Sequence, residues 1–297
     1  MGAFAFEVGV QSAQIAPVAD VVETSPPEPV GATRSDANSV MQAGDSDASN
    51  TGISADGPII VLVIDDVGVD ADNSARAINL NQPVTISILP YADNASGLDA
   101  MARMRGHETF VHLPMEPEGL ADPGPHALTR HLSAEDTRAR VRWAIEQIPG
   151  ATGLNNHMGS AVTQDAARMR TILLPLAGRD LMFLDSLTAP DSRAFAVARD
   201  LGLTVLRRDI FIDHENSADA IADRLSEIER HAERNGFVIA IGHPRDLTMD
   251  ALEVWIPDAV SRGYRFVTVS QLVEGQSRAP VRSAALGEIM SLGGGAK

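Results

Sequence analysis

Short runs of apolar, mostly β-branched residues recur along the middle of the chain, and each is followed by a stretch of helical character. The first run, PIIVLVI at residues 58–64, contains no polar side chain, which is typical of a strand buried on both faces. Further strands are expected at residues 84–89, 109–113, 151–155, 181–185, 203–208, 237–242 and 264–270. Helices are expected near residues 71–79, 94–105, 134–148, 163–176, 191–201, 217–235 and 248–262. This alternation predicts a parallel sheet covered by helices, and about seven or eight such units favour a closed or slightly open β/α barrel.

Compositionally biased segments flank this region. Residues 1–57 are rich in Ala, Ser, Pro, Asp and Gly, and they hold eight acidic residues against one basic residue, Arg34. Few large apolar side chains are available there to offset the entropy of ordering. We therefore expect residues 1–57 to be a disordered acidic linker, residues 58–274 to be the folded domain, and residues 275–297 to be a disordered C-terminal tail.

The start of the chain does not read as an export signal. Its first ten residues have no basic n-region and meet Glu7 early, so no signal peptide is predicted. We prefer an ordinary disordered end to the remnant of a membrane anchor, although a membrane tether missing from this chain is the alternative.

Charge and composition exclude several classes of function. Asp and Glu outnumber Lys and Arg by 40 to 24, which gives a formal net charge of −16. Such a chain repels nucleic-acid phosphates and anionic lipids, so neither is an expected partner. The absence of cysteine means that a metal ion must be held by His, Asp or Glu. No G-x-G-x-x-G or G-x-x-x-x-G-K-[ST] motif follows the first strand, which argues against a nucleotide-binding sheet.

Polar residues are concentrated where the predicted strands end. Six strands carry Asp, His or Asn at that point, and these residues are Asp65, Asp66, His112, Asn155, Asn156, His157, Asp185, Asp213 and His243. All strands of a parallel barrel open on one face at their C-terminal ends, so these side chains are expected to meet at a single site. One Asp and two His residues suit Zn²⁺ or a similar divalent ion and leave a position open for water.

Each of these residues also has a structural explanation. The Asp65–Asp66 pair could cap a helix, His112 could be a hydrogen-bonded core histidine, and His243 could belong to a simple turn. Two carboxylates arranged for glycoside hydrolysis are a further alternative, but they would leave the histidines unexplained. The remaining histidines are assigned to loops and solvated helix faces, and they are His107, His126, His131, His214 and His231.

Six motifs together resemble the divergent polysaccharide deacetylase family over nearly the whole predicted domain. They are VIDDVG (63–68), HLPMEP (112–117), GLNNHMGS (153–160), FLDSLT (183–188), RRDIFID (207–213) and IGHP (241–244), in this order. The resemblance implies a deformed (β/α) barrel of about seven parallel strands, a divalent metal cofactor for which Zn²⁺ is expected, and an acetylated glycan or polysaccharide as substrate. It also implies an extracytoplasmic location, in the periplasm or cell envelope. The oligomeric state is left open.

The resemblance also suggests roles for individual residues. Asp65 stands where these deacetylases keep a catalytic base, and Asp66 stands where they keep a metal ligand. His112 corresponds to a metal-binding histidine, and His243 corresponds to the histidine that acts as general acid. His157 is assigned as the third metal ligand from its motif and its position at the end of a strand.

Five further residues are candidates for substrate binding. Asn155 and Asn156 are expected to bind the substrate or the oxyanion, and Asp185, Arg208 and Asp213 are additional candidates. The alternative for Asp185 and Asp213 is to cap the next helix, and the alternative for Arg208 is a local ion pair with its neighbours.

We therefore expect a metal-dependent hydrolase that removes N- or O-linked acetyl groups from a polysaccharide or envelope glycan. The alternative is a catalytically inactive glycan-binding or partner-regulating envelope module with the same barrel. Two departures motivate the alternative. The sequence reads V-I-D-D-V where the familiar deacetylases carry T-F-D-D-G, and Glu116 stands four residues after His112, where those enzymes have a second histidine.

Overall fold

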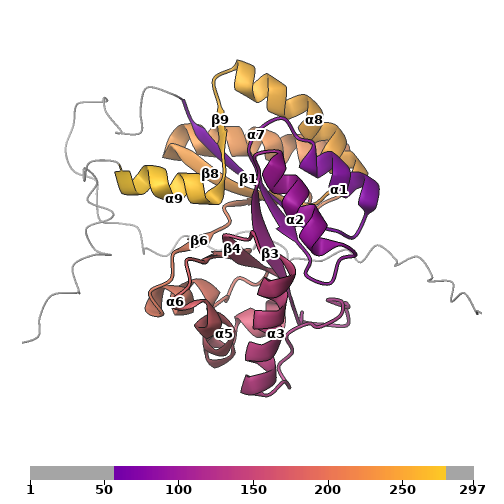
Figure 1. The fold of residues 1–297 in the computed structure, drawn as a ribbon. Helices are drawn as coiled ribbons and strands as arrows, with labels where there is room; N and C mark the ends of the chain where they lie inside the picture. Colours follow the sequence, from indigo (N-terminus) through magenta and orange to yellow (C-terminus); the bar gives the residue numbers. More distant parts are fainter. Residues whose placement is uncertain (1–56, 279–297) are drawn as a thin grey trace, which may run out of the picture.

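The computed structural model describes residues 57–278, which form a curled sheet of parallel strands with helices packed around it (Figure 1). The strands are β1 (Ile59–Val67), β2 (Thr85–Ile88), β3 (Glu108–Met115), β4 (Gly153–Met158), β5 (Met182–Asp185), β6 (Val205–Arg207), β7 (Ile210–Phe211), β8 (Phe237–Gly242) and β9 (Arg265–Val267). Their order in the sheet is β6-β5-β4-β3-β2-β1-β8-β7, and β9 pairs with β1. The predicted (β/α) barrel class is therefore confirmed.

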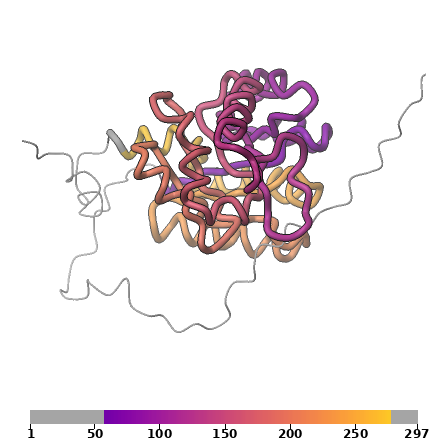
Figure 2. The backbone as a smooth tube through the Cα atoms, turned by 90° about the horizontal axis from the view of Figure 1, so that it is seen from below, coloured from indigo at the N-terminus to yellow at the C-terminus, as the bar shows by residue number. Residues whose placement is uncertain are grey.

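Strand β1 has more partners than the other described strands, because it pairs with β2, β8 and β9. One edge pairs with β8 over Ile59 to Ile64. The other edge pairs with β9 near the start of β1 and with β2 near its end. Residues 60–64 consequently have no exposed surface, which explains why this run contains no polar side chain. Seen from below in Figure 2, the indigo start of the domain lies next to its orange and yellow end, as these pairings require.

The two end strands of the curled sheet, β6 and β7, are consecutive in the chain. Strand β6 pairs with β5, and β7 pairs with β8. The two residues between them continue this change of partner: Arg208 N donates to the Asp185 carbonyl at 3.1 Å, and Asp209 N donates to the Ile239 carbonyl at 2.9 Å. This crossing draws the C-terminal ends of β5 and β8 toward each other.

The helices lie between the strands as the sequence predicts. They are α1 (Ala71–Ile78), α2 (Ala95–Met104), α3 (Ala134–Gln147), α4 (Ser160–Thr163), α5 (Ala166–Leu173), the 3₁₀ turn η1 (Leu174–Leu176), α6 (Ala194–Asp200), α7 (Ala218–Asn235), α8 (Asp246–Ser261) and α9 (Val269–Arg278). Helix α7 illustrates their packing, because Ile221, Leu225, Ile228 and Ala232 form one buried stripe at helical spacing. Helix α3 begins as expected at Ser133, whose side chain accepts a hydrogen bond from Asp136 N.

The end of the domain differs from the expectation. The strand predicted at 264–270 ends at Val267, and α9 then runs past the predicted domain boundary at residue 274 to Arg278. The cause is a reciprocal cap: Thr268 N donates to Gln271 Oε1 at 3.0 Å, and Gln271 N donates to Thr268 Oγ1 at 3.3 Å. The rest of the two predicted tails, up to residue 56 and from residue 279, lies outside the described residues.

His107 is not the solvated loop residue that the sequence suggested. It is 5% exposed, its Nε2 lies 2.9 Å from the Ile78 carbonyl, and its Nδ1 accepts a hydrogen bond from Val84 N at 3.3 Å. It therefore joins the end of α1 to the start of β2. The other four histidines of that group are exposed or half-buried, as expected.

Candidate metal centre

Three potential metal ligands meet where β1, β3 and β4 end. Asp66 Oδ1 lies 2.8 Å from His157 Nδ1 and 3.1 Å from His112 Nε2, and the two ring nitrogens are 3.2 Å apart. This oxygen is buried and makes no hydrogen bond of normal geometry. Tetrahedral bonds of about 2.0–2.1 Å place ligand atoms about 3.3 Å apart, which is close to these separations. The three residues therefore fit a divalent metal ion.

A local break in β1 allows two adjacent carboxylates to serve one site. Successive side chains of a regular strand point to opposite faces of the sheet. Here the register with β2 shifts between Ile64 and Val67, and Asp66 adopts a left-handed backbone with φ of 56°. His112 Nε2 consequently lies near both carboxylates, 3.1 Å from Asp66 Oδ1 and 3.7 Å from Asp65 Oδ2. Bulges of this kind often re-aim side chains beside active sites.

Asn155 connects the second carboxylate, Asp65, to the candidate metal ligand His112. Its Nδ2 donates to Asp65 Oδ1 at 2.7 Å, and its Oδ1 accepts from His112 Nδ1 at 2.9 Å and from Ser87 Oγ. Because His112 Nδ1 is the donor in this contact, the lone pair of its neutral ring is on Nε2, which faces Asp66. Asn155 is fully buried and positions both groups through these hydrogen bonds.

His243 follows β8, and the buried carboxylate of Asp213, which lies just after β7, orients its ring. Asp213 Oδ1 lies 3.0 Å from His243 Nδ1, and Asp213 Oδ2 accepts from His243 N and from Thr248 Oγ1, both at 2.9 Å. Burial would lower the pKa of His243, but the charges of Asp213 and Asp66 raise that pKa to about 10. The ring is therefore an imidazolium at neutral pH, and its Nε2 lies 3.8 Å from Asp66 Oδ2.

The surroundings shift the pKa values of the two adjacent carboxylates, Asp65 and Asp66, in opposite directions. Burial raises the pKa of Asp65, and the nearby His112 and His243 offset this effect only in part. Burial also acts on Asp66, but His157 and His243 hold the pKa of Asp66 well below its usual range. Burial would lower the pKa of His112, yet Asp65 and Asp66 raise it. Asp66 is thus the carboxylate that stays ionised, whereas Asp65 is the stronger base.

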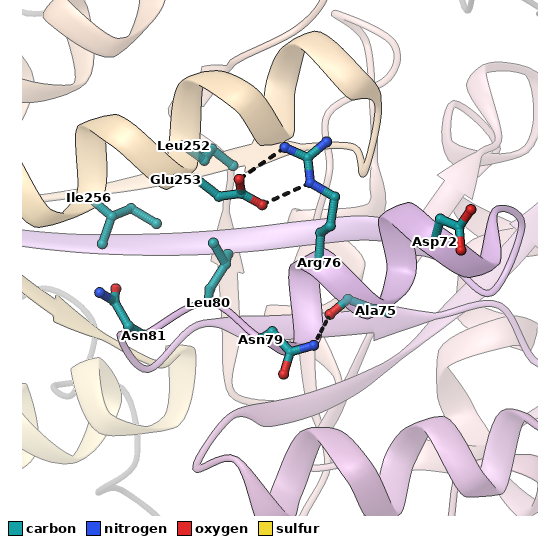
Figure 3. A pocket seen from close by; sticks show the side chains of 9 residues that line it. All are labelled: Asp72, Ala75, Arg76, Asn79, Leu80, Asn81, Leu252, Glu253 and Ile256. Carbon is teal, nitrogen blue, oxygen red and sulfur yellow. Dashed lines mark hydrogen bonds and ion pairs between the residues drawn. The ribbon is translucent and has the colours of Figure 1, made fainter.

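A small pocket opens beside these groups. Its wall includes Asp65, His112, Asn156, Arg208, Phe211 and His243. A larger cavity of about 330 Å³ lies elsewhere, between α1 and α8. There Arg76 reaches across to Glu253, as Figure 3 shows, and none of the candidate ligands lines that cavity.

The five residues predicted to bind substrate separate into two groups. Asn155, Asp185 and Asp213 are fully buried and bonded to protein groups, so we revise their interpretation from substrate contacts to support of the site. Asn156 and Arg208 are in the pocket wall. Asn156 is also tied down, because its Nδ2 donates to the Met158 carbonyl at 2.8 Å and its Oδ1 accepts from Ser186 N at 2.9 Å.

The loop after β5 is held in a strained shape at the pocket. Leu187 has a left-handed backbone with φ of 52°, which costs roughly 1–2 kcal/mol for a residue with a Cβ. Asp185 Oδ1 accepts from Leu187 N at 3.0 Å, and Asp185 Oδ2 accepts from Ser192 Oγ at 3.0 Å. Asp185 therefore stabilises this loop and does not cap the next helix, which begins at Ala194 without a side-chain cap.

Sequence reasoning missed several supporting residues. Ser87 and Thr248 touch the groups described above but belong to none of the motifs, and Phe211 lies within RRDIFID without having been singled out. Ser87 had a usable signal, because it is a polar residue within the apolar run TISI, and such a residue needs a buried partner.

Comparisons with known proteins extend these observations. The model of a family described as divergent polysaccharide deacetylase matches residues 62–273. The uncharacterized protein YibQ of Escherichia coli K12 is 31% identical over 194 residues, which are 65% of this chain and 61% of that protein. The chain thus spans less than two thirds of that relative's length.

Solved structures show the same fold. The crystal structure of an uncharacterized protein from Agrobacterium tumefaciens C58 superposes with a TM-score of 0.70 at 26% identity, covering 73% of this chain and 90% of that one. A variant of the peptidoglycan deacetylase PdaC from Bacillus subtilis gives a TM-score of 0.50 at 14% identity, covering 75% and 93%. The latter is a likeness of fold alone.

Proposed function

Because the chain belongs to the divergent polysaccharide deacetylase family, we propose that it is a metal-dependent hydrolase that removes N- or O-linked acetyl groups from a polysaccharide or envelope glycan. One observation carries the proposal. Asp66, His112 and His157 converge within 4.8 Å beside the second buried carboxylate, Asp65, and the oriented imidazolium of His243. A purely structural cluster would have no use for three ligand atoms facing one another around a carboxylate oxygen without a hydrogen bond.

Asp66, His112 and His157 would hold the divalent ion, and we propose Zn²⁺ because it accepts mixed imidazole and carboxylate ligands. When bound, the ion would polarise the acyl carbonyl and lower the pKa of a water molecule. Asn155 supports the ligand set by fixing the tautomer of His112.

Asp65 is proposed as the general base. Asn155 holds its Oδ1, while its Oδ2 lies 3.7 Å from His112 Nε2 and faces the ligands. Its raised pKa makes Asp65 a better proton acceptor than an exposed carboxylate. It takes one proton as the oxygen of water forms a bond to the acetyl carbon.

His243 is proposed as the general acid. Asp213 keeps this ring charged and directs Nε2 toward the ligands. As the bond between the acetyl carbon and the sugar nitrogen or oxygen breaks, Nε2 gives its proton to the leaving sugar atom. Acetate and the deacetylated sugar are then the two products, and the proton held by Asp65 returns His243 to its starting state.

The test compares metal content and acetate release in the parent chain, Asp65→Asn and His157→Ala. We expect about one equivalent of divalent metal in the parent, none in His157→Ala, and full metal with about 10²–10⁴-fold slower acetate release in Asp65→Asn. Undiminished release by Asp65→Asn would show that this residue is not the base. Metal binding without acetate release from any acetylated glycan would favour the inactive glycan-binding module.

We further propose that the substrate is met outside the cytoplasm, in the periplasm or cell envelope, since the family resemblance points to envelope glycans. In residues 57–278, no helix has the length and apolar character needed to span a membrane. The proposal is tested by fractionating cells that express the full natural protein and locating it by immunoblot.

A further inference from the structure

Arg208 reaches the wall of the candidate pocket from the crossing between β6 and β7. Its side chain lines the same pocket as Asp65, His112 and His243. The guanidinium is fixed from two directions: Nε donates to the Ser186 carbonyl at 2.7 Å, and Nη2 donates to the Leu187 carbonyl at 3.0 Å. The crossing between β6 and β7 therefore places a positive charge at the site.

An aromatic ring supports the same guanidinium. The Arg208 Cζ atom lies 5.0 Å from the centroid of Phe211, and the edge of the Phe211 ring packs against His243 with centroids 5.2 Å apart. Arginine stacked on an aromatic face keeps its planar fork in one orientation. Arg208 and the proposed general acid consequently share one supporting side chain.

The loop that anchors Arg208 is built at a conformational cost. Leu187 is left-handed, and this turn presents the successive carbonyls of Ser186 and Leu187 to one guanidinium. Asp185 and Asn156 hold the turn through the backbone N–H groups of Leu187 and Ser186. Strain of this kind persists where surrounding contacts enforce it, and it is concentrated at ligand-binding sites.

We infer that Arg208 is a specificity residue that binds an anionic group, a carboxylate or a phosphate, on the acetylated glycan. This inference rests on the proposed function. A guanidinium carries five N–H donors in a plane that matches both kinds of oxyanion. The chain has a net charge of −16, so most of its charge disfavours an anionic ligand. A positive side chain fixed in the pocket therefore gives a local preference for a negatively charged group of the substrate.

The test uses three sugars that share the N-acetyl group. N-acetylglucosamine is neutral, N-acetylmuramic acid adds a carboxylate, and N-acetylglucosamine 6-phosphate adds a phosphate. Their affinities for the full chain are measured by calorimetry. We expect the parent to bind at least one anionic sugar about tenfold or more tightly than the neutral sugar, because hydrogen bonds to charged groups are the strong ones. The anionic sugar that binds more tightly than the neutral sugar shows whether the recognised group is a carboxylate or a phosphate.

Arg207 provides a matched control, because it neighbours Arg208 but lies over Phe195 and faces Asp185 at 3.7 Å. Arg208→Gln should abolish the preference for the anionic sugar, whereas Arg207→Gln, with the same loss of charge, should retain it. Arg208→Lys keeps the charge but not the fork, so its preference should fall below that of the parent even if Arg208→Gln does not fold.

Equal affinity of the parent for all three sugars, no measurable binding of either anionic sugar, or a preference that survives in Arg208→Gln would overturn the inference. Acetate release is measured on the same samples. A preference that is found although no acetylated glycan releases acetate would count against the hydrolysis and leave the anion site standing, and acetate release without a preference would refute the anion site alone.

Discussion

Replacing the buried Asn155 by leucine should lower both the stability of the domain and the affinity of the candidate site for metal. The two side chains are similar in size, but leucine removes the donor to Asp65 and Ser186 and the acceptor from His112 and Ser87. Four buried polar groups then lose a partner, and each such loss costs about 1–3 kcal/mol. We expect the free energy of unfolding to fall by at least about 3 kcal/mol, which is a large part of the stability of an ordinary domain.

The same substitution should weaken metal binding. Without Asn155, no acceptor fixes the proton of His112 on Nδ1, so the ring no longer presents Nε2 reliably to the ion. Loss of a partner of this kind typically costs 10–100-fold in metal affinity, on the order found for outer-shell substitutions. The affinity is measured by competition with a chelator of known strength, and stability is measured by urea unfolding in the presence of EDTA, so that the two effects are separated.

Ser186→Ala is the matched control, because it removes only the 3.2 Å bond from Asn155 Nδ2 to Ser186 Oγ. Its unfolding free energy should fall by about 1 kcal/mol, with metal affinity unchanged. Asn155→Asp preserves an acceptor for His112 and should retain the metal better than Asn155→Leu. If Asn155→Leu binds metal as tightly as Ser186→Ala, Asn155 does not orient His112, and our reasoning on the tautomer is wrong.

Three further substitutions, at Asp213, Gly153 and Thr268, have expected outcomes. The charges of Asp213 and Asp66 raise the pKa of His243 from its unfolded value of about 6.5 to about 10. The stability that this shift contributes is complete below pH 6.5 and is lost as the pH rises to 10. Asp213→Asn should therefore make the free energy of unfolding, measured in urea across this range, depend less on pH. The same substitution should move the alkaline limit of acetate release to lower pH. Gly153→Ala would place a Cβ 2.5 Å from the ring of Phe110 and should cost about 1–3 kcal/mol in unfolding free energy, whereas Gly275→Ala, where an added Cβ meets nothing within 4 Å, lacks that clash. Thr268→Ala removes one half of a helix cap and should cost about 1 kcal/mol by the same assay, and an unchanged value would show that the cap does not stabilise α9.

The strand pattern was readable from the sequence because burial on both faces of a parallel sheet demands uninterrupted apolar runs. The same logic placed Asp66, His112 and His157 at strand ends, and the structure brings their ligand atoms together. The cap at Thr268 and Gln271 was equally local, but the apolar run before it concealed the change from strand to helix.

Other features depend on contacts between distant segments. The left-handed backbone of Asp66 follows from a shift in pairing with β2, which no residue type announces. Asn155 lies 90 positions from Asp65 and 43 from His112, so its role as a bridge emerges only when β1, β3 and β4 are adjacent. Arg208 reaches the pocket because the chain changes partner from β5 to β8 between β6 and β7, and no sequence pattern announces that change.

The pairing of β1 with β8 and β9 has a consequence for synthesis of the chain. Strand β1 leaves the ribosome first among the described strands, but the partner for one of its edges, β8, begins at Phe237, roughly 180 residues later. At about 5–20 residues per second, that edge waits roughly 10–35 s for its neighbour. An unpaired apolar edge readily joins another chain during such an interval. Nascent chains of this protein should therefore depend on a chaperone that shields β1 until the last third of the domain has emerged.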